Sequence, residues 1–95
     1  MIEILTFRLV DGADERAFVD ADTRVLTGFR YRQPGFLRST TGRNDDGRWI
    51  VLVIWATPEA AEDARVAFEA SDFAPEFSAF VDQATVVRDR FVGLD

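Results

Sequence analysis

The sequence predicts an α+β fold of element order β-α-β-β-α-β, with a four-stranded antiparallel sheet and the helices on one face. Two observations predict this fold. The spacing of apolar residues changes between a period of two, typical of strands, and steps of three and four, typical of helices. Turn-forming pairs that contain Gly or Pro lie where the spacing changes. A chain of 95 residues has the length of one domain, so we treat residues 1–95 as a single unit.

The first third of the chain predicts a strand followed by a helix. Residues 2–9 are β-branched and aromatic with rough alternation, and Asp11-Gly12 predicts the turn that ends this strand. From Asp14 to about Arg32 the apolar residues follow helical spacing. The apolar stripe of this helix consists of Phe18, Ala21, Val25 and Phe29. Gln33-Pro34-Gly35 is expected to end the helix, because Pro cannot continue it.

The middle third predicts a hairpin. Residues 36–43 and 49–56 are predicted strands, and Asn44-Asp45-Asp46-Gly47 between them is a turn sequence. The acidic residues of this loop lack the alternating ligands and the distal Glu of a calcium loop. We therefore assign no metal to it.

The last third predicts two helical segments and a final strand. Thr57-Pro58 is a helix start, with Thr as the N-cap and Pro at the first helical position. A helical stripe follows it: Ala60, Ala64, Ala67 and Phe68. Ser71-Asp72 interrupts this helix, and a short third helix is expected through Phe73, Phe77, Phe80 and Val81. Residues 84–92 predict the fourth strand.

The composition argues against several classes of protein. All 11 basic residues are Arg, 17 residues are acidic, and the formal net charge is −6. Lys, His and Cys are absent, which excludes Schiff-base chemistry, zinc fingers, disulfides and nucleophilic relays built on Cys or His. The excess of acid argues against nucleic acid and against an anionic membrane surface as partners. The first residues lack the positive region of a signal peptide and no apolar run is long enough for a membrane span, so we expect a cytoplasmic protein.

The third predicted strand is apolar on both faces. One face carries the odd-numbered residues from Trp49 to Trp55, and the other carries Ile50, Leu52 and Ile54. A sheet with one face in water would alternate apolar and polar residues here. The helices of so short a chain can cover only one face. We therefore expect a homodimer in which a second copy covers the other face, with a monomer as the alternative.

Short motifs recur over nearly the whole chain: Pro34-Gly35-Phe36, Trp55, Thr57-Pro58-Glu59-Ala60, and Ser71-Asp72-Phe73 with Phe77. Together they resemble the antibiotic biosynthesis monooxygenase-like family of the dimeric α/β-barrel superfamily. The resemblance implies a ferredoxin-like protomer that dimerises through its sheet, with a cavity between sheet and helices. Members of the superfamily include cofactor-independent oxygenases of polycyclic aromatic compounds, haem-degrading enzymes, small isomerases and stress-responsive proteins.

The sequence departs from two catalytic patterns of this superfamily. Haem-degrading relatives use an Asn on the first strand, the Trp that closes the third strand, and a His on the second helix. Only Trp55 can be matched here, which argues against haem breakdown. Quinone-forming oxygenases add an Asn four residues before this Trp and a Tyr six residues after it, where this chain has Val51 and Ala61. The resemblance therefore extends to the scaffold and not to a complete catalytic set.

Trp55 and Asp22 are the candidate catalytic residues. The resemblance implies that the indole N–H of Trp55 donates to a substrate carbonyl or to a peroxide intermediate; a purely packing role is the alternative. Asp22 lies within the apolar stripe of the first helix, where a carboxylate must be paired or have a raised pKa. It is a candidate general base, and the alternatives are an ion pair with an Arg or a position at the edge of the stripe in contact with water.

The candidate ligand-binding residues are four aromatic residues and one arginine: Phe18, Phe29, Tyr31, Phe77 and Arg38. The Phe side chains would wall a cavity for a small apolar or aromatic ligand, and core packing is their alternative role. Tyr31 would orient a hydroxylated ligand at the cavity mouth or pack at the surface. Arg38, like the other arginines on strands, would hold an anionic or phenolate ligand or pair with acids across strands.

Two functions are therefore open. One is cofactor-independent oxygenation, in which a deprotonated substrate reduces oxygen without a metal or flavin; Asp22 would be the base, Trp55 the donor and an Arg the anion stabiliser. The other is a non-catalytic ligand-binding or stress-responsive dimer, which the incomplete catalytic set favours. A small isomerase or cyclase that uses the same base without oxygen is a third possibility.

Overall fold

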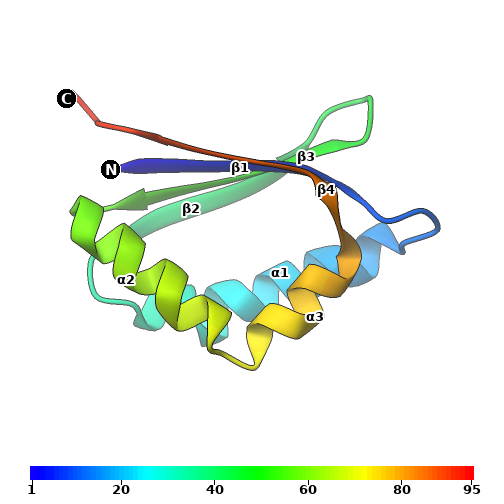
Figure 1. The fold of residues 1–95 in the computed structure, drawn as a ribbon, viewed down its shortest axis with the longest axis horizontal. Coiled ribbons are helices and arrows are strands. Elements are labelled where there is room, and N and C mark those ends of the chain that lie inside the picture. The colour runs from blue at the N-terminus through cyan, green and yellow to red at the C-terminus, as the bar shows by residue number, and fades with distance from the viewer.

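A single antiparallel sheet with all its helices on one side forms the architecture of residues 1–95 in the computed structural model (Figure 1). The four strands are β1 (Ile2–Leu9), β2 (Phe36–Arg43), β3 (Arg48–Trp55) and β4 (Val81–Phe91), in the order β2-β3-β1-β4. The helices are α1 (Glu15–Gly28), α2 (Pro58–Glu69) and α3 (Phe73–Phe80). The predicted α+β, ferredoxin-like arrangement is confirmed.

Side-chain caps start α1 and α2; the cap at Thr57 was predicted, whereas Asp14 was placed inside the first helix and proves to be its N-cap. The Asp14 carboxylate accepts hydrogen bonds from the backbone N–H groups of Arg16 and Ala17, at 2.9 and 3.2 Å, and so caps α1. The Thr57 hydroxyl accepts from the backbone N–H of Ala60 at 3.0 Å, and Pro58 begins α2, where its missing N–H is not needed. These local signals place both helices in the chain before any tertiary contact is considered.

The first helix is shorter than predicted. It ends at Gly28 and not near Arg32, and a 3₁₀ turn, η1 (Arg30–Arg32), follows it. Gly28 passes close to α3, since a Cβ on it would lie 2.6 Å from Cζ of Phe73. Beyond this contact the chain tightens into bonds between residues three apart, because it must become extended before Pro34 and enter β2. The consequence is that Arg30 turns inward and is buried.

The last strand begins earlier than predicted. Val81, expected at the end of the third helix, is the first residue of β4 and pairs with Leu9. A register shift between Thr6 and Arg8 separates this pair and the pair Arg8–Asp82 from the remainder of the β1–β4 ladder. The irregular step lets β4 leave α3 without a connecting loop, which sequence periodicity does not reveal.

The aromatic part of the core fills one end of the space between sheet and helices. Phe7 and Phe18 are fully buried, and their rings meet edge-on with centroids 5.7 Å apart. The Phe18 ring also meets the Trp49 indole edge-on, at 5.0 Å. Trp49 lies near the start of β3 and Trp55 ends it, so the two indoles pack at opposite ends of this strand.

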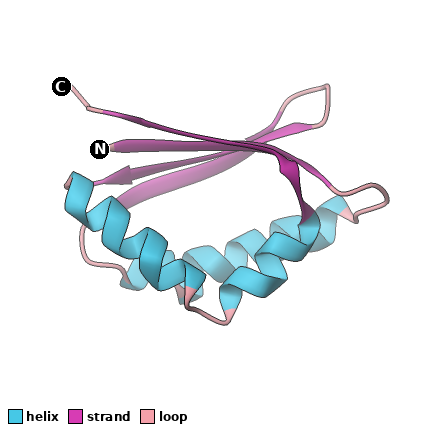
Figure 2. Ribbon diagram, viewed as in Figure 1, coloured by secondary structure: helices cyan, strands magenta, loops and turns pink.

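The other face of the sheet is uncovered and carries an apolar strip along β1 and β3, with polar residues such as Arg38 and Thr40 on the neighbouring β2. β3 alternates as predicted, with its odd-numbered residues buried and its even-numbered residues half-buried. The strand register places Leu52 beside Ile4, and Ile54 beside Ile2, on this outer face. Figure 2 shows the helices only on the opposite side of the sheet. The chain itself therefore leaves these side chains partly open to solvent.

Candidate functional site

A cavity of about 110 Å³ lies between the sheet and the helices and opens to the surface on one side. Its apolar walls come from β1, β3 and the helical layer: Leu5, Val25, Phe29, Val51, Val53, Trp55, Ala64, Phe68 and Phe77. β3 contributes alternate residues, because only every second side chain of a strand faces the helices. Five charged side chains complete the lining: Glu3, Arg30, Arg65, Glu69 and Arg88.

Trp55 places an unpaired hydrogen-bond donor in this wall. The residue is 4% exposed, and its Nε1 is the one buried side-chain nitrogen or oxygen without a hydrogen-bond partner in the chain. The Phe36 ring packs edge-on against the indole, with centroids 5.7 Å apart, and fixes its plane. A buried N–H without an acceptor costs about 1–3 kcal/mol. Because Nε1 has almost no accessible surface, a ligand oxygen reaches it only when the side chains around the indole move aside, and such a contact would recover this free energy.

Asp22 is connected to the cavity through Arg30. Nη2 of Arg30 donates to Oδ1 of Asp22 at 3.1 Å, and the Thr41 hydroxyl donates to Oδ2 at 2.7 Å. Both charged residues are 8% exposed, so each supplies the opposite charge that burial of the other requires. Arg30 lines the cavity and Asp22 does not. These contacts fit the ion-pair alternative for Asp22.

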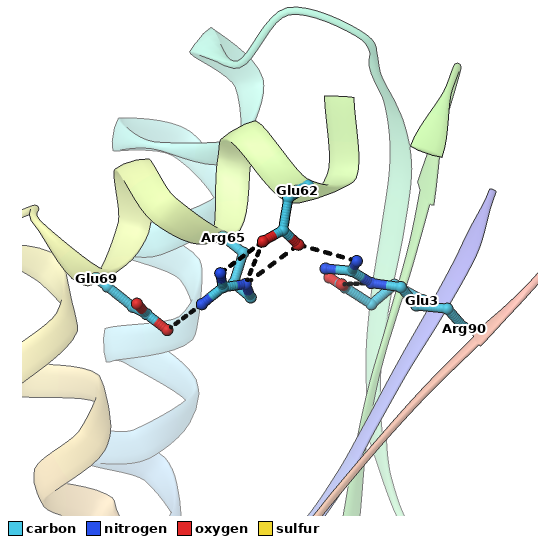
Figure 3. A network of polar contacts seen from close by, with 5 residues as sticks. All are labelled: Glu3, Glu62, Arg65, Glu69 and Arg90. Carbon is cyan, nitrogen blue, oxygen red and sulfur yellow. Dashed lines mark hydrogen bonds and ion pairs between the residues drawn. The ribbon is translucent and has the colours of Figure 1, made fainter. Parts of the chain in front are cut away.

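A network of ion pairs crosses from α2 to the sheet beside the cavity (Figure 3). Glu62 accepts hydrogen bonds from Arg65, and from Arg90 at 3.0 Å. Arg90 also donates to Glu3 at 3.0 Å, and Arg65 to Glu69 at 2.8 Å. Glu3, Arg65 and Glu69 line the cavity, so the network forms part of its polar rim.

The network shifts the ionisation of three of its members. Hydrogen bonds from Arg65 and then from Arg90 lower the pKa of Glu62 from 4.5 to about 2. The bonds to Glu62 and Glu69 raise the pKa of Arg65. Burial alone would lower the pKa of Arg90, but its bonds to Glu3 and Glu62 outweigh burial and raise it. Glu62, Arg65 and Arg90 are therefore charged at neutral pH.

The structure brings only some of the predicted site residues together. Trp55, Phe29 and Phe77 line the cavity. Phe18 lies one layer behind, with its ring 5.4 Å from that of Phe77, and is fully buried.

Two further predicted ligand-binding residues lie outside the cavity. Tyr31 is 62% exposed and packs against the Phe36 ring. Arg38 is exposed and pairs with Ile54, which places it on the outer face of the sheet. Fewer of the predicted ligand-binding residues therefore line the cavity than the sequence indicated.

Sequence reasoning did not assign Arg30, Arg65 or Glu3 to the site. The sequence places Arg30 in the last turn of the predicted first helix, where a basic residue suits the helix dipole. One signal was available, because Asp22 and Arg30 are eight residues apart and so lie close to the same side of a helix. Nothing in the periodicity places Arg65 and Glu3 together, because their association depends on how α2 packs over the sheet.

The sheet order, the one-sided helical layer and the cavity between them define a ferredoxin-like protein. The chain is similar in structure to SnoaB, a cofactor-independent oxygenase from Streptomyces nogalater, with a TM-score of 0.79 and 21% sequence identity. The match covers 99% of this chain and 92% of SnoaB. A putative antibiotic biosynthesis monooxygenase from Bordetella bronchiseptica is 18% identical, with 96% and 95% of the two chains covered and a TM-score of 0.76. The resemblance seen in the sequence is thus confirmed in the fold.

Another putative antibiotic biosynthesis monooxygenase, from Caulobacter crescentus, is 14% identical with a TM-score of 0.76, covering 99% of this chain and 89% of that one. Comparison with protein-family models and with curated proteins found no match. No helix of the chain is long and apolar enough to cross a membrane. Its acidic side chains form no group of three that could hold a metal ion.

Proposed function

We propose that the chain binds a small, mainly apolar aromatic compound in this cavity and oxygenates it without a cofactor. The observation that carries the proposal is the unpaired Nε1 of Trp55 beside an apolar cavity. A flat ligand that presents an oxygen acceptor to this N–H would satisfy the donor and bury its rings against Phe29, Phe68 and Phe77. The similarity of the fold to that of SnoaB, a cofactor-independent oxygenase, supports the reaction class.

The size of the cavity limits what can be enclosed. An engineered protein cavity of about 150 Å³ holds one benzene, and the space here is about 110 Å³. At most one aromatic ring of a ligand would therefore be enclosed by the cavity. A second or third ring would extend through the open side, between α2 and the sheet.

The proposed reaction balances without a metal or flavin. A CH₂ group next to a conjugated carbonyl or phenol loses a proton, and the resulting anion transfers electrons to O₂ and forms a C–O bond. The peroxide takes up a proton and then loses water, which leaves a carbonyl on carbon; one oxygen atom stays in the product and one leaves in water. Donors fixed beside the developing charge, such as Trp55 and an arginine of the lining, would stabilise the anion and the peroxide.

The general base of this reaction stays a prediction. Both carboxylate oxygens of Asp22 already accept hydrogen bonds, so it would have to exchange one of them for the substrate. The two carboxylates that line the cavity, Glu3 and Glu69, are paired with Arg90 and Arg65. These pairings favour the second candidate function, a non-catalytic ligand-binding protein with the same cavity.

We also propose that the protein is a cytoplasmic homodimer assembled through the outer face of the sheet. Ile2, Ile4, Leu52 and Ile54 form an apolar face that no helix of the chain covers (Figure 1). A second copy would bury this face without requiring a further element.

Oxygen uptake with and without Trp55 tests the proposed function. Anthrone-type phenols, which carry a CH₂ group next to a conjugated carbonyl, are added to the wild type and to Trp55→Phe while oxygen and tryptophan fluorescence are recorded. We expect uptake in the wild type and a loss of at least about tenfold in the variant, since one N–H directed at a developing oxyanion contributes that much or more. Trp49→Phe is the matched control, because Trp49 is equally buried on the same face of β3 but does not line the cavity.

The outcomes separate the two candidate functions. Fluorescence quenching without oxygen uptake would identify a binding protein. Equal activity of Trp55→Phe and Trp49→Phe would remove Trp55 from the mechanism. If no compound changes either signal, the cavity has no role in binding aromatic compounds.

A further inference from the structure

Three arginines line the cavity, and they differ in how many of their guanidinium N–H groups already donate to protein atoms. Arg65 forms ion pairs with both Glu62 and Glu69, so its N–H groups already donate to carboxylates of the rim network. Arg88 makes no ion pair, but it is exposed on β4, where water competes for its N–H groups. Of the three, only Arg30 is buried and also has most of its N–H groups without an acceptor, which makes it the strongest charged donor in the lining.

Arg30 donates a single side-chain hydrogen bond in the chain, from Nη2 to Asp22. Its Nε and Nη1 donate to no protein atom, although the residue is only 8% exposed. A guanidinium carries five N–H donors, so most of this one is free to bind a ligand. Its position in the cavity lining makes a ligand in the cavity the natural acceptor.

Asp22 and Thr41 hold this guanidinium in place. The Asp22 carboxylate is itself fixed at both oxygens, by Arg30 at 3.1 Å and by the Thr41 hydroxyl at 2.7 Å. Its charge cancels that of Arg30, so the buried pair is neutral as a whole. The arrangement presents preorganised N–H groups without a large net charge, and Asp22 is accordingly a positioning residue.

We propose that Arg30 is the specificity-determining residue of the cavity and binds the oxygen of a phenolate on the enclosed aromatic ring. The inference rests on the proposed function, because it assigns a ligand class to the same cavity. The apolar walls favour an anion whose charge is spread into a ring over a strongly hydrated carboxylate, which would lose more solvation on entry. A charge-assisted hydrogen bond from Nε or Nη1 of Arg30 would then fix the ring with its oxygen toward η1 and away from the Asp22 carboxylate.

Binding of para-nitrophenol and para-nitrotoluene tests this assignment. The two compounds have nearly the same shape and share the nitro group, and only the first presents a phenolate, at a pH where it is ionised. Their affinities are measured by calorimetry for the wild type and for the double variant Asp22→Asn with Arg30→Gln. The double variant keeps the net charge and leaves no buried charge unpaired, so it should fold; thermal unfolding verifies this.

We expect the double variant to lose about tenfold or more in affinity for para-nitrophenol, as for a hydrogen bond to a charged group. Its affinity for para-nitrotoluene should change by less than about threefold. Arg32→Gln is the matched control: Arg32 is exposed in the same 3₁₀ turn, so its loss changes the long-range field and not the cavity. Para-nitrobenzoate should bind the wild type more weakly than para-nitrophenol.

Three results would overturn the assignment. If the double variant loses affinity for both nitro compounds equally, or for neither, Arg30 does not bind the phenolate oxygen while the cavity proposal stands. If para-nitrobenzoate binds more tightly than para-nitrophenol, the ligand class is wrong. If the wild type binds none of the compounds, the cavity proposal fails and this inference fails with it.

Discussion

At the scale of single residues, burial separates side chains that the sequence presents as equivalent. Asp20 and Asp22 are neighbouring acids on α1, yet Asp20 is exposed and Asp22 is buried against Arg30 and Thr41. The difference follows from helical geometry, because two residues along a helix turn the side chain by more than half a circle. Only Asp22 lies on the face that packs on the sheet, where its charge must be compensated.

Removal of this compensation should destabilise the protein. Asp22→Ala leaves the buried guanidinium of Arg30 without its counter-charge, and we expect the free energy of unfolding to fall by about 3 kcal/mol. Urea denaturation measures the change. Asp20→Ala on the same helix is the control and should stay within about 0.5 kcal/mol of the wild type. Equal losses in the two variants would show that the ion pair does not stabilise the fold.

The same residues show what a sequence can predict about this site. The burial of Asp22 was visible in its helical position, and the capping role of Thr57 in the Thr-Pro pair, because each depends on local geometry. The inward position of Arg30 was not visible, because it results from the early end of α1 against α3. Periodicity indicates which face of an element is buried, but not where the packing of two layers leaves a cavity.

At the scale of secondary-structure elements, α2 is held to the sheet beside the cavity by charged contacts as well as by packing. Its inner face is made of small residues, and Ala61 and Ala64 are its buried positions. Gly35, with a φ of +80°, allows the start of β2 to approach α2, since a Cβ there would lie 2.6 Å from that of Ala60. On the other side of α2, the side chains of Glu62 and Arg90 make the connection to β4.

The ion pairs of α2 should make its anchoring depend on pH in a defined range. The pKa of Glu62 is about 2 in the folded chain against an ordinary 4.5, so the stabilisation is fully present above about pH 4.5 and is lost as the pH falls toward 2. We expect the difference in urea midpoint between the wild type and Glu62→Gln to be constant at higher pH and to shrink through this range. Added salt should also reduce it, because the pairs are exposed to solvent.

A second substitution on α2 controls for the loss of one acidic residue. Asp63 is exposed next to Glu62 and makes no ion pair, so Asp63→Asn reports the effect of charge alone. A difference for Glu62→Gln that is independent of pH and salt would contradict the assigned role of the network.

At the scale of the whole molecule, a single chain leaves one face of its sheet uncovered and in contact with solvent. The helices cover the face that carries Trp49 and Trp55, and no element covers the face that carries Ile4, Leu52 and Ile54 (Figure 2). A domain of this size buries a smaller fraction of its surface than a larger one does, so an exposed apolar face costs it proportionately more. Association through this face would therefore stabilise the fold as well as define the assembly.

A charge in the middle of the outer face tests this association. Leu52 lies in the centre of β3 and faces Ile4 and Thr40 on the neighbouring strands. In Leu52→Glu the carboxylate can reach water in a single chain, because this position is only half-buried there, but it would be buried without a partner between two sheets. We expect the wild type to sediment as a dimer at micromolar concentration and Leu52→Glu as a folded monomer. Val66→Glu, at an exposed apolar position on α2, should remain dimeric. A wild-type monomer would contradict the proposed association, and a dimer that tolerates Leu52→Glu but not Val66→Glu would place the interface elsewhere.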